Sequence, residues 1–374
     1  MSRLKLMTIL GTRPEIIRLS EVIKCADRYF DHVLVHTGQN YDYTLNQVFF
    51  ENLGLREPDH YLESAGADLG ETMGNIIAGS YKLMADVRPD AVLILGDTNS
   101  ALSAISAKRL KIPIFHMEAG NRCWDWNVSE MINRKIVDHI SDINMPYTEH
   151  SRRYLLSEGI DGKTVFVTGS PMKEVLLKNR EKIEASGILE ELSLSPRKYF
   201  LVSAHREENI DIEANFMDLM NSINHIAEKY DMPVIYSTHP RSKKFIDARG
   251  FVFDKRVRSL KPFGYFDYNK LQENAFCVLS DSGTLSEESA MMDFPAVLIR
   301  TSTERPEVLD KGSVVIGGIR QEDVEQAVEL ATSMFEAGEP YVEAGDYADG
   351  NVSVKVIKLI QSYTKIVNKT VWLK

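Results

Sequence analysis

A strand–helix–strand pattern between residues 91 and 134 predicts a parallel sheet with acidic side chains along one edge. Apolar runs at 91–95 and 112–115 have the length of strands, and an amphipathic helical segment separates them. Strands connected in this way lie parallel in one sheet. Asp97 and Glu118 follow the two runs. We therefore expect both carboxylates at the carboxyl edge, where open α/β sheets bind their ligands.

A third acid and two arginines occur in the same stretch. Glu130 follows on a loop rich in Trp and Asn, with Arg122 before it and Arg134 after it. An acid after a strand often serves only to cap the next helix, and Asp97-Thr98-Asn99 has good capping chemistry. The prediction of a site therefore depends on three carboxylates converging at one edge, and not on any one of them.

The length of the chain and its alternating pattern predict the architecture. A chain of 374 residues exceeds the usual size of a single core, and strands alternate with helices throughout, which is typical of the α/β class. We expect two similar α/β halves with a central cleft, 1–172 and 173–353. A final helix at 354–374 has an apolar stripe that must be buried, and we expect it to pack back on the first half. We expect the last strand of the first half at 164–169.

Charge and cysteine content exclude several classes of protein. The net charge is −10 and the pI is near 5.5, without a basic run, which argues against a nucleic-acid partner. Three widely spaced cysteines are typical of a reducing compartment. No apolar run approaches the ~20 residues of a membrane span, and the first apolar run meets Arg13 too early for a signal peptide. We expect a cytoplasmic protein without a membrane partner.

The second half contains a candidate phosphate site. Residues 278–289 read as a strand that runs through Ser282-Gly283 into a helix. Backbone N–H groups at such a helix start bind phosphate when a small residue allows close approach. Glu287, one turn later, is suited to ribose hydroxyls. The alternative is an ordinary strand–helix turn with a serine cap.

Further cationic side chains follow predicted strands. His205 comes directly after the strand at 199–204, Arg13 follows the first strand, and Arg305 lies in the cluster at 303–307. Arginine is suited to bidentate contacts with phosphate or carboxylate. The sequence contains no GxGxxG fingerprint, P-loop, CxxC pair or HExxH motif. We therefore expect no nicotinamide, no catalytic metal and no other cofactor.

Five motifs together resemble the non-hydrolysing UDP-N-acetylglucosamine 2-epimerases. They run in order along the chain, and their joint occurrence is highly specific. They are GTRPE at 11–15, GDT at 96–98, HMEAG at 116–120, DSG at 281–283 and TERPE at 303–307. Three further segments resemble the branch that makes UDP-N-acetyl-L-fucosamine for capsule and O-antigen, namely 118–125, 132–144 and 261–268.

This resemblance implies a fold and a reaction. The fold would be two Rossmann-like domains in the arrangement of GT-B glycosyltransferases, usually as a homodimer. The enzyme would be an isomerase acting on a UDP-sugar. UDP would be eliminated across C1 and C2 to give a 2-acetamidoglycal, and would then be added back with the opposite configuration at C2. In the narrower branch the substrate is UDP-2-acetamido-2,6-dideoxy-β-L-talose.

The resemblance also assigns residues, by position in the motifs. The implied catalytic residues are the three proton-transferring carboxylates and a histidine beside the leaving group: Asp97, Glu118, Glu130 and His205. The implied substrate-binding residues contact the diphosphate, the nucleoside or the sugar, and they are Arg13, Arg18, Arg122, Arg134, Phe263, Tyr268, Ser282, Gly283, Thr284, Glu287 and Arg305.

The chain departs from the wider family at several of these motifs. Arg18 replaces a lysine, and residues 121–123 read Asn-Arg-Cys where the family usually has Leu-Arg-Thr. Ser129 and Met131 replace the proline and second glutamate that flank the catalytic glutamate. Thr284 replaces a glycine, which we expect to alter how the pyrophosphate sits. Apolar and aromatic residues in the altered loops suit a sugar with a methyl group at C5.

Three classes of function remain open at this point. The first is a sugar-nucleotide 2-epimerase, with UDP-N-acetylglucosamine and UDP-N-acetylmannosamine as the alternative substrate pair. The second is a GT-B glycosyltransferase, which requires an acceptor, and the third is a catalytically silent sensor of nucleotide sugars. The retained acids favour the epimerase over the sensor, and the complete motif set favours it over the transferase. The sequence does not assign the base and the acid among the carboxylates.

Overall fold

Each half of the chain folds around a parallel sheet of six strands. The computed structural model describes residues 3–39, 43–124, 126, 128–300, 303–339 and 344–374. The chain divides into a first unit, Met1–Lys178 with Asp346–Lys374, and a second unit, Asn179–Gly345. The sequence predicts the junctions between the units at 172 and 353, whereas in the structure they lie at 178 and 345. The first junction is later because α7 (Met172–Lys178) packs on α1 of the first unit.

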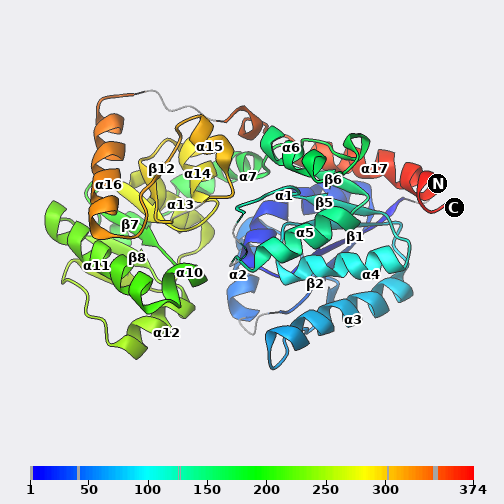
Figure 1. Cartoon of the computed structure of the whole chain (residues 1–374), viewed down its shortest axis with the longest axis horizontal. Coiled ribbons are helices and arrows are strands. Elements are labelled where there is room, and N and C mark those ends of the chain that lie inside the picture. The colour runs from blue at the N-terminus through cyan, green and yellow to red at the C-terminus, as the bar shows by residue number, and fades with distance from the viewer. Residues whose placement is uncertain (1–2, 40–42, 125, 127, 301–302, 340–343) are drawn as a thin grey trace. The chain divides into compact units, whose positions relative to one another are not determined.

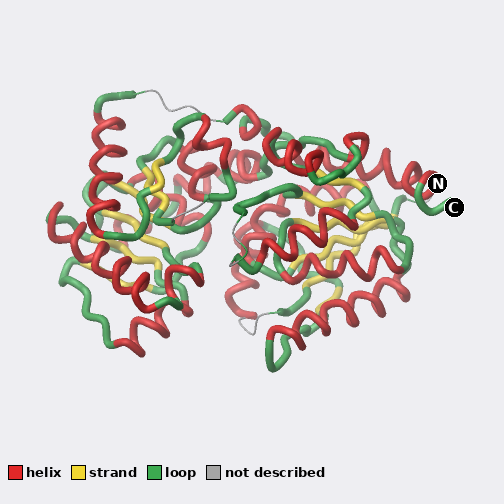
Figure 2. The backbone as a smooth tube through the Cα atoms, in the orientation of Figure 1, coloured by secondary structure: helices red, strands yellow, loops and turns green. Residues whose placement is uncertain are grey.

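The first sheet has the strand order β3-β2-β1-β4-β5-β6, and every neighbouring pair is parallel. All five residues of the strand at 91–95 are buried, as expected of a parallel strand covered by helices on both faces. Figure 2 shows the strands of this unit between layers of helix. The strands are β1 (Lys5–Leu10), β2 (Asp31–His36), β3 (His60–Tyr61), β4 (Ala91–Leu95), β5 (Ile114–Met117) and β6 (Ile143–Met145).

The helices of the first unit include the C-terminal helix, which lies along α1, as Figure 1 shows. Glu174 accepts hydrogen bonds from the backbone N–H of Ser353 at 2.8 Å and from its hydroxyl at 2.6 Å, and so fixes the start of that helix. The prediction that the final helix packs on the first half is confirmed. The helices are α1 (Arg13–Tyr29), α2 (Tyr43–Leu53), α3 (Leu69–Val87), α4 (Ser103–Arg109), α5 (Glu130–Ile140), α6 (Glu149–Ser157), α7 and α17 (Val352–Thr370), with the 3₁₀ turns η1 (Asn99–Leu102), η2 (Gly162–Thr164) and η3 (Gly345–Tyr347).

The second sheet has the order β12-β11-β10-β7-β8-β9, and it is also parallel throughout. When its strands are counted from β7, the order is the same as in the first sheet, read from the other edge. Both units therefore have the doubly wound order 3-2-1-4-5-6. The strands are β7 (Phe200–Ser203), β8 (Val234–Ser237), β9 (Val257–Leu260), β10 (Cys277–Ser280), β11 (Ala296–Leu298) and β12 (Val315–Ile316).

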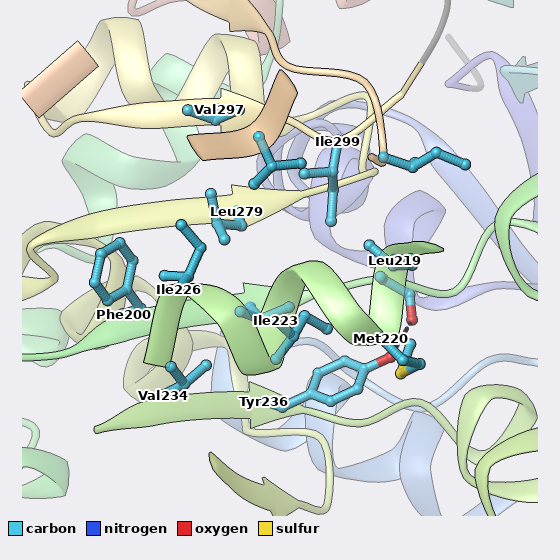
Figure 3. Close-up of a cluster of buried hydrophobic side chains, with 14 of the residues drawn as sticks. Phe200, Leu219, Met220, Ile223, Ile226, Val234, Tyr236, Leu279, Val297 and Ile299 are labelled. Carbon is cyan, nitrogen blue, oxygen red and sulfur yellow. Dashed lines mark hydrogen bonds between the residues drawn. The ribbon is translucent and has the colours of Figure 1, made fainter. Parts of the chain in front are cut away.

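A single helix supplies much of the core of the second unit. The stripe of Leu219, Met220, Ile223 and Ile226 on α11 is buried against side chains from the sheet, as Figure 3 shows. The spacing of this stripe is that of one helix face. The helices are α8 (Arg180–Glu184), α9 (Ile188–Glu191), α10 (Glu207–Ile210), α11 (Glu213–Tyr230), α12 (Pro240–Arg249), α13 (Tyr265–Asn274), α14 (Leu285–Met292), α15 (Pro306–Asp310) and α16 (Gln321–Glu336).

The strand order fixes where each unit can bind a ligand. In a doubly wound sheet, the crevice lies at the carboxyl ends of the two central strands, where the connections leave in opposite directions. These strands are β1 and β4 in the first unit and β7 and β10 in the second. The predicted strand at 164–169 is not formed, and this segment contributes a bridge between Asn144 and Val165. Within the described ranges no helix is both long and apolar enough to cross a membrane.

Candidate active site

Glu118 lies at the carboxyl edge of the first sheet, directly after β5. Its carboxylate accepts hydrogen bonds from the Arg18 guanidinium and, at 3.1 Å, from the side-chain amide of Asn121. The side chain is only 7% exposed. A Cβ atom added to Gly96 would lie 3.4 Å from Glu118 Oε2, so the carboxylate rests beside the backbone that leads into Asp97.

The backbone of Glu118 is itself unusual. Its φ is +61°, in the left-handed region that residues other than glycine seldom adopt. Such a conformation costs of order 1–3 kcal/mol and persists where the surrounding structure enforces it, often at functional sites. The turn after β5 therefore orients this carboxylate through a strained backbone conformation, which costs free energy.

Asp97 follows β4 and is held by two residues of α5. Arg134 donates from Nε to its carboxylate at 2.6 Å, and Asn133 donates to its backbone carbonyl at 2.9 Å. Glu130 is the first residue of the same helix, one turn before Arg134. Residues four apart lie on the same helix face. Helix α5 thus positions Glu130 and the partner of Asp97 together.

Arg122 is not placed among these carboxylates. Its guanidinium is fully buried, 2.8 Å from Asp138 and 2.8 Å from Glu158, and it also donates to the carbonyl of Asn121. Our expectation that Arg122 contacts the substrate is therefore replaced by a role in the core. Burial would raise the pKa of Glu158, but hydrogen bonds from Arg122 and Lys135 outweigh it and hold the pKa at about 2.

Asp138 is a residue of this region that the sequence reasoning missed. It accepts from the N–H of Gly120 at 3.1 Å and lies 3.0 Å from His116 Nδ1, so it holds the residues two before and two after Glu118. Burial opposes a charge on His116, but contact with Asp138 prevails and raises the pKa of that histidine. The sequence signal that could have identified Asp138 is its position one turn after Arg134 on the same amphipathic helix.

The end of β1 brings Arg13 and a buried acid to the same edge of the sheet. Arg13 begins α1, with its guanidinium 6.0 Å from the centre of the Phe49 ring. Glu15 accepts from the N–H of Gly11 at 3.1 Å and from the hydroxyl of Thr12 at 2.8 Å. Burial raises the pKa of Glu15 to about 7, against the hydrogen bonds that lower it.

The sugar-facing loop predicted from its aromatic residues is described in part. Trp124 is exposed and packs edge-on against Tyr154, with Lys135 Nζ 5.5 Å from its ring. Cys123 Sγ lies 3.9 Å from Arg134 Nη1. Asp125 lies outside the described residues. In the second unit, Phe263 is partly exposed in the loop before α13.

In the second unit, the loop after β7 is fastened to the end of β10. Asp281 accepts from the backbone N–H groups of His205 at 2.8 Å and Arg206 at 2.9 Å, and from the amide of Asn209. His205 Nδ1 lies 3.4 Å from the other oxygen of Asp281, and the ring of His205 is 40% exposed. The fully buried Asp281, which was not among the predicted site residues, thus leaves the imidazole accessible.

The predicted phosphate seat leads into α14. The hydroxyls of Ser282 and Thr284 lie 2.9 Å apart, and the N–H of Thr284 donates to Ser282 Oγ at 3.3 Å. A Cβ at Gly283 would lie 2.6 Å from Glu304 Oε1, so a larger residue at this position would displace the end of that side chain. Thr284 has an ordinary φ of −78°. The replacement of the family's glycine by threonine therefore does not strain the backbone.

Glu287 and Arg305 form a buried ion pair at 2.7 Å. Arg305 also lies 4.0 Å from Glu307, but the loss of Glu287 would remove the shorter contact of this buried guanidinium. The pair therefore braces α14 against the segment that contains Arg305. Nearby on α13, burial and the proximity of Glu288 raise the pKa of Tyr268 well above its ordinary value, so its hydroxyl stays neutral.

The structure thus gathers the predicted residues into two groups, one at each switch point. Asp97, Glu118, Glu130, Arg13, Arg18 and Arg134 belong to the edge of the first sheet, and His205, Ser282, Gly283, Thr284, Glu287 and Arg305 to that of the second. The described residues contain no cluster of His, Cys, Asp and Glu that fits a metal ion.

Known proteins resemble the chain over its whole length. The UDP-N-acetylglucosamine 2-epimerase family profile matches residues 24–361. A curated UDP-N-acetylglucosamine 2-epimerase from Methanocaldococcus jannaschii is 36% identical over 337 residues, which cover 87% of this chain and 92% of that protein. A UDP-2,3-diacetamido-2,3-dideoxy-D-glucuronate 2-epimerase from Pseudomonas aeruginosa is 30% identical, with 95% and 100% covered.

Solved structures agree with these relatives. The structure of UDP-N-acetylglucosamine 2-epimerase from Rickettsia bellii superposes with a TM-score of 0.92 at 46% identity, covering 100% of both chains. That of the M. jannaschii enzyme, in complex with UDP-GlcNAc and UDP, gives a TM-score of 0.89 at 32% identity, covering 96% of this chain and 99% of that one. With the acids and the doubly wound sheets described above, these matches show that the chain belongs to the UDP-N-acetylglucosamine 2-epimerase family and is an isomerase, a UDP-sugar 2-epimerase.

Proposed function

We propose that this enzyme interconverts UDP-2-acetamido-2,6-dideoxy-β-L-talose and UDP-N-acetyl-β-L-fucosamine. A carboxylate of the first unit takes the proton from C2, the C1–O bond breaks, and its electron pair leaves with UDP. The resulting 2-acetamidoglycal then receives UDP at C1 and a proton at C2 on the opposite face. Removal of a weakly acidic C2 proton requires a positioned base and a stabilised leaving group.

The residues of the two switch points divide this work. Asp97, Glu118 and Glu130 transfer protons, and inversion requires two acid/base groups that reach opposite faces of C2. His205 and Arg13 stabilise the diphosphate as its charge develops. The N–H groups at the start of α14 also bind the diphosphate.

The observation that supports the L-sugar pair is the environment of Glu118. Arg18 and Asn121, which stand where the wider family has lysine and leucine, both hydrogen-bond to this one carboxylate. The ring of an L-sugar presents its C2 hydrogen differently from that of a D-glucosamine, so the group that removes it must be aimed differently. Such a change of substrate requires different hydrogen-bond partners around the carboxylate that transfers the proton. The P. aeruginosa relative, named for a diacetamido-glucuronate, supports variation of the sugar within the family.

A second candidate is the interconversion of UDP-N-acetylglucosamine and UDP-N-acetylmannosamine. The relative from R. bellii, with 46% identity, bears the name of that activity. A methyl-binding contact alone discriminates between sugars by about 1–3 kcal/mol. The choice between the two therefore requires kinetics.

Comparison of kcat/KM for both substrate pairs tests the proposal. We expect the 6-deoxy-L-talose and L-fucosamine pair to be turned over much faster than UDP-N-acetylglucosamine. Equal or greater efficiency with UDP-N-acetylglucosamine would contradict the proposal and support the second candidate. The resemblance also leads us to propose a cytoplasmic homodimer that supplies capsule or O-antigen synthesis, and light scattering of the purified enzyme would test the dimer.

A further inference from the structure

A chain of hydrogen bonds inside the first unit ends on the carboxylate of Glu118. It starts in the first turn of α6, where the hydroxyl of Thr148 donates to Ser151 Oγ at 3.3 Å. The hydroxyl of Ser151 donates to the side-chain oxygen of Asn121 at 3.1 Å. The amide nitrogen of Asn121 then donates to Glu118 Oε1 at 3.1 Å. All four side chains are buried.

Each bond in this chain sets the direction of the next. The hydroxyl of Ser151 donates to the carbonyl oxygen of Asn121, so the carboxamide must turn its N–H₂ group toward Glu118. The N–H of Ser151 donates to Thr148 Oγ1 at 3.2 Å, which holds the serine in the helix start. The carboxamide is thus oriented before it meets the carboxylate. A buried donor of this kind would cost free energy if it were left unpaired.

The backbone between these residues prevents the chain from shifting. Gly120 has a φ of +82°, and a Cβ there would lie 2.4 Å from the carbonyl oxygen of Ser151 and 2.9 Å from Leu155 Cγ. Helix α6 therefore presses directly on the turn that carries Glu118 and Asn121. Arg18 holds the other oxygen of the carboxylate, Oε2. The two oxygens are thus held by Arg18 of α1 and by Asn121, which Ser151 of α6 orients.

We infer that Asn121, oriented by Ser151, is a positioning residue for catalysis, which fixes the plane of the Glu118 carboxylate. The inference rests on the proposed proton-transfer role of Glu118. A carboxylate held at one oxygen alone can rotate, and a misplacement of about 1 Å can cost about 100-fold in rate. Loss of Asn121 should therefore lower the rate of the chemical step.

The test compares Asn121→Leu with Asn224→Leu. Leucine has a similar size and lacks the amide. Asn224 is the matched control, because its carboxamide also makes two hydrogen bonds, to the carbonyl of Val252 and from the N–H of Asp254, in the second unit. Both variants and the parent are assayed with the UDP-sugar that the parent turns over, so the result does not depend on which sugar is the natural one.

We expect Asn121→Leu to lower kcat by about 10–100-fold with little change in KM, because the substrate still binds but meets a misplaced carboxylate. Asn224→Leu should leave kcat and KM unchanged. An unchanged kcat in Asn121→Leu, or a loss that appears in KM alone, would overturn the inference.

Ser151→Ala keeps the test decisive if Asn121→Leu does not fold. It removes the bond that orients the carboxamide but keeps Asn121, so we expect a smaller loss of kcat, again with little change in KM. A Ser151→Ala enzyme with the parental kcat would contradict the inference. Glu118→Gln separates the two claims. An inactive Glu118→Gln beside an unaffected Asn121→Leu would refute the inference alone, whereas normal turnover by Glu118→Gln would refute the proposed role of Glu118 as well.

Discussion

Replacement of Glu15 by glutamine should stabilise the enzyme at neutral and alkaline pH. Glu15 is buried at the end of β1, and burial raises its pKa from 4.5 to about 7. Its Oε2 accepts from the N–H of Gly11 and the hydroxyl of Thr12, and the carbonyl oxygen of a glutamine accepts the same two bonds. The exchange therefore keeps the hydrogen bonds and removes the charge that has to be buried.

The size of the effect follows from the difference in pKa. The difference between 4.5 and about 7 is about 2.5 units, which corresponds to roughly 3 kcal/mol at 1.36 kcal/mol per unit. Between these pH values the folded chain holds a proton that the unfolded chain has lost. The stabilising contribution of neutral Glu15 is therefore complete below about pH 4.5 and is lost as the pH rises to about 7. Above that, the folded protein contains a buried carboxylate.

Urea denaturation at pH 5 and at pH 8 measures this effect. We expect the parent and Glu15→Gln to have similar free energies of unfolding at pH 5, and the variant to be more stable at pH 8 by up to about 3 kcal/mol. Glu149→Gln, at an exposed acid in the first turn of α6, should show the same small difference at both pH values. If the difference between Glu15→Gln and the parent does not grow from pH 5 to pH 8, the carboxyl is not held neutral by burial.

Three further predictions concern the packing and the ion pairs of the site. Gly120→Ala should lower the free energy of unfolding by about 1–3 kcal/mol, because its Cβ would overlap the carbonyl of Ser151; a stability equal to the parent in urea would refute this close approach. Glu158→Gln should destabilise the protein at pH 7 but not near pH 2, because the parent loses the stabilisation of its ionised Glu158 as the pH falls from about 4.5 to about 2; an equal difference at both pH values in urea would argue against the ion cluster. Glu287→Ala should weaken UDP binding in calorimetry, since it removes the nearer of the two carboxylates that hold the buried Arg305, and unchanged affinity would move the nucleotide site elsewhere.

The fold was predictable where apolar runs are long and regular. The strand at 91–95 is a continuous apolar run, whereas the run predicted at 112–115 begins two residues before the observed strand, Ile114–Met117. The parallel pairing of these two strands places Asp97 and Glu118 at one edge. The edge strands β3 and β9 were missed for the opposite reason. The first has two residues, and the second, Val257–Leu260, reads Val-Arg-Ser-Leu and is largely exposed. Such strands owe their conformation to pairing with distant residues and not to their own pattern.

The direction in which a side chain points was less predictable than its position. Arg122 and Arg134 lie on either side of Glu130 in the sequence, yet Arg134 binds Asp97 while Arg122 turns into the core. That choice is made by Asp138, whose distance from Arg122 along the chain gives no sign of contact. The role of Asp281 was likewise not predictable, because an acid that follows a strand is interpreted as a helix cap until its hydrogen-bond partners are known.

Exchange of the C2 hydrogen in deuterated water tests the central claim most directly. The purified enzyme is incubated with each UDP-sugar in deuterated water, without an acceptor, and the C2 proton is followed by NMR. The account predicts that deuterium enters at C2 as the two epimers interconvert, and that Asp97→Asn, Glu118→Gln and Glu130→Gln each slow the exchange by about 10²–10⁴-fold. Epimerisation without incorporation of deuterium, or parental exchange rates in all three variants, would contradict proton transfer by these carboxylates.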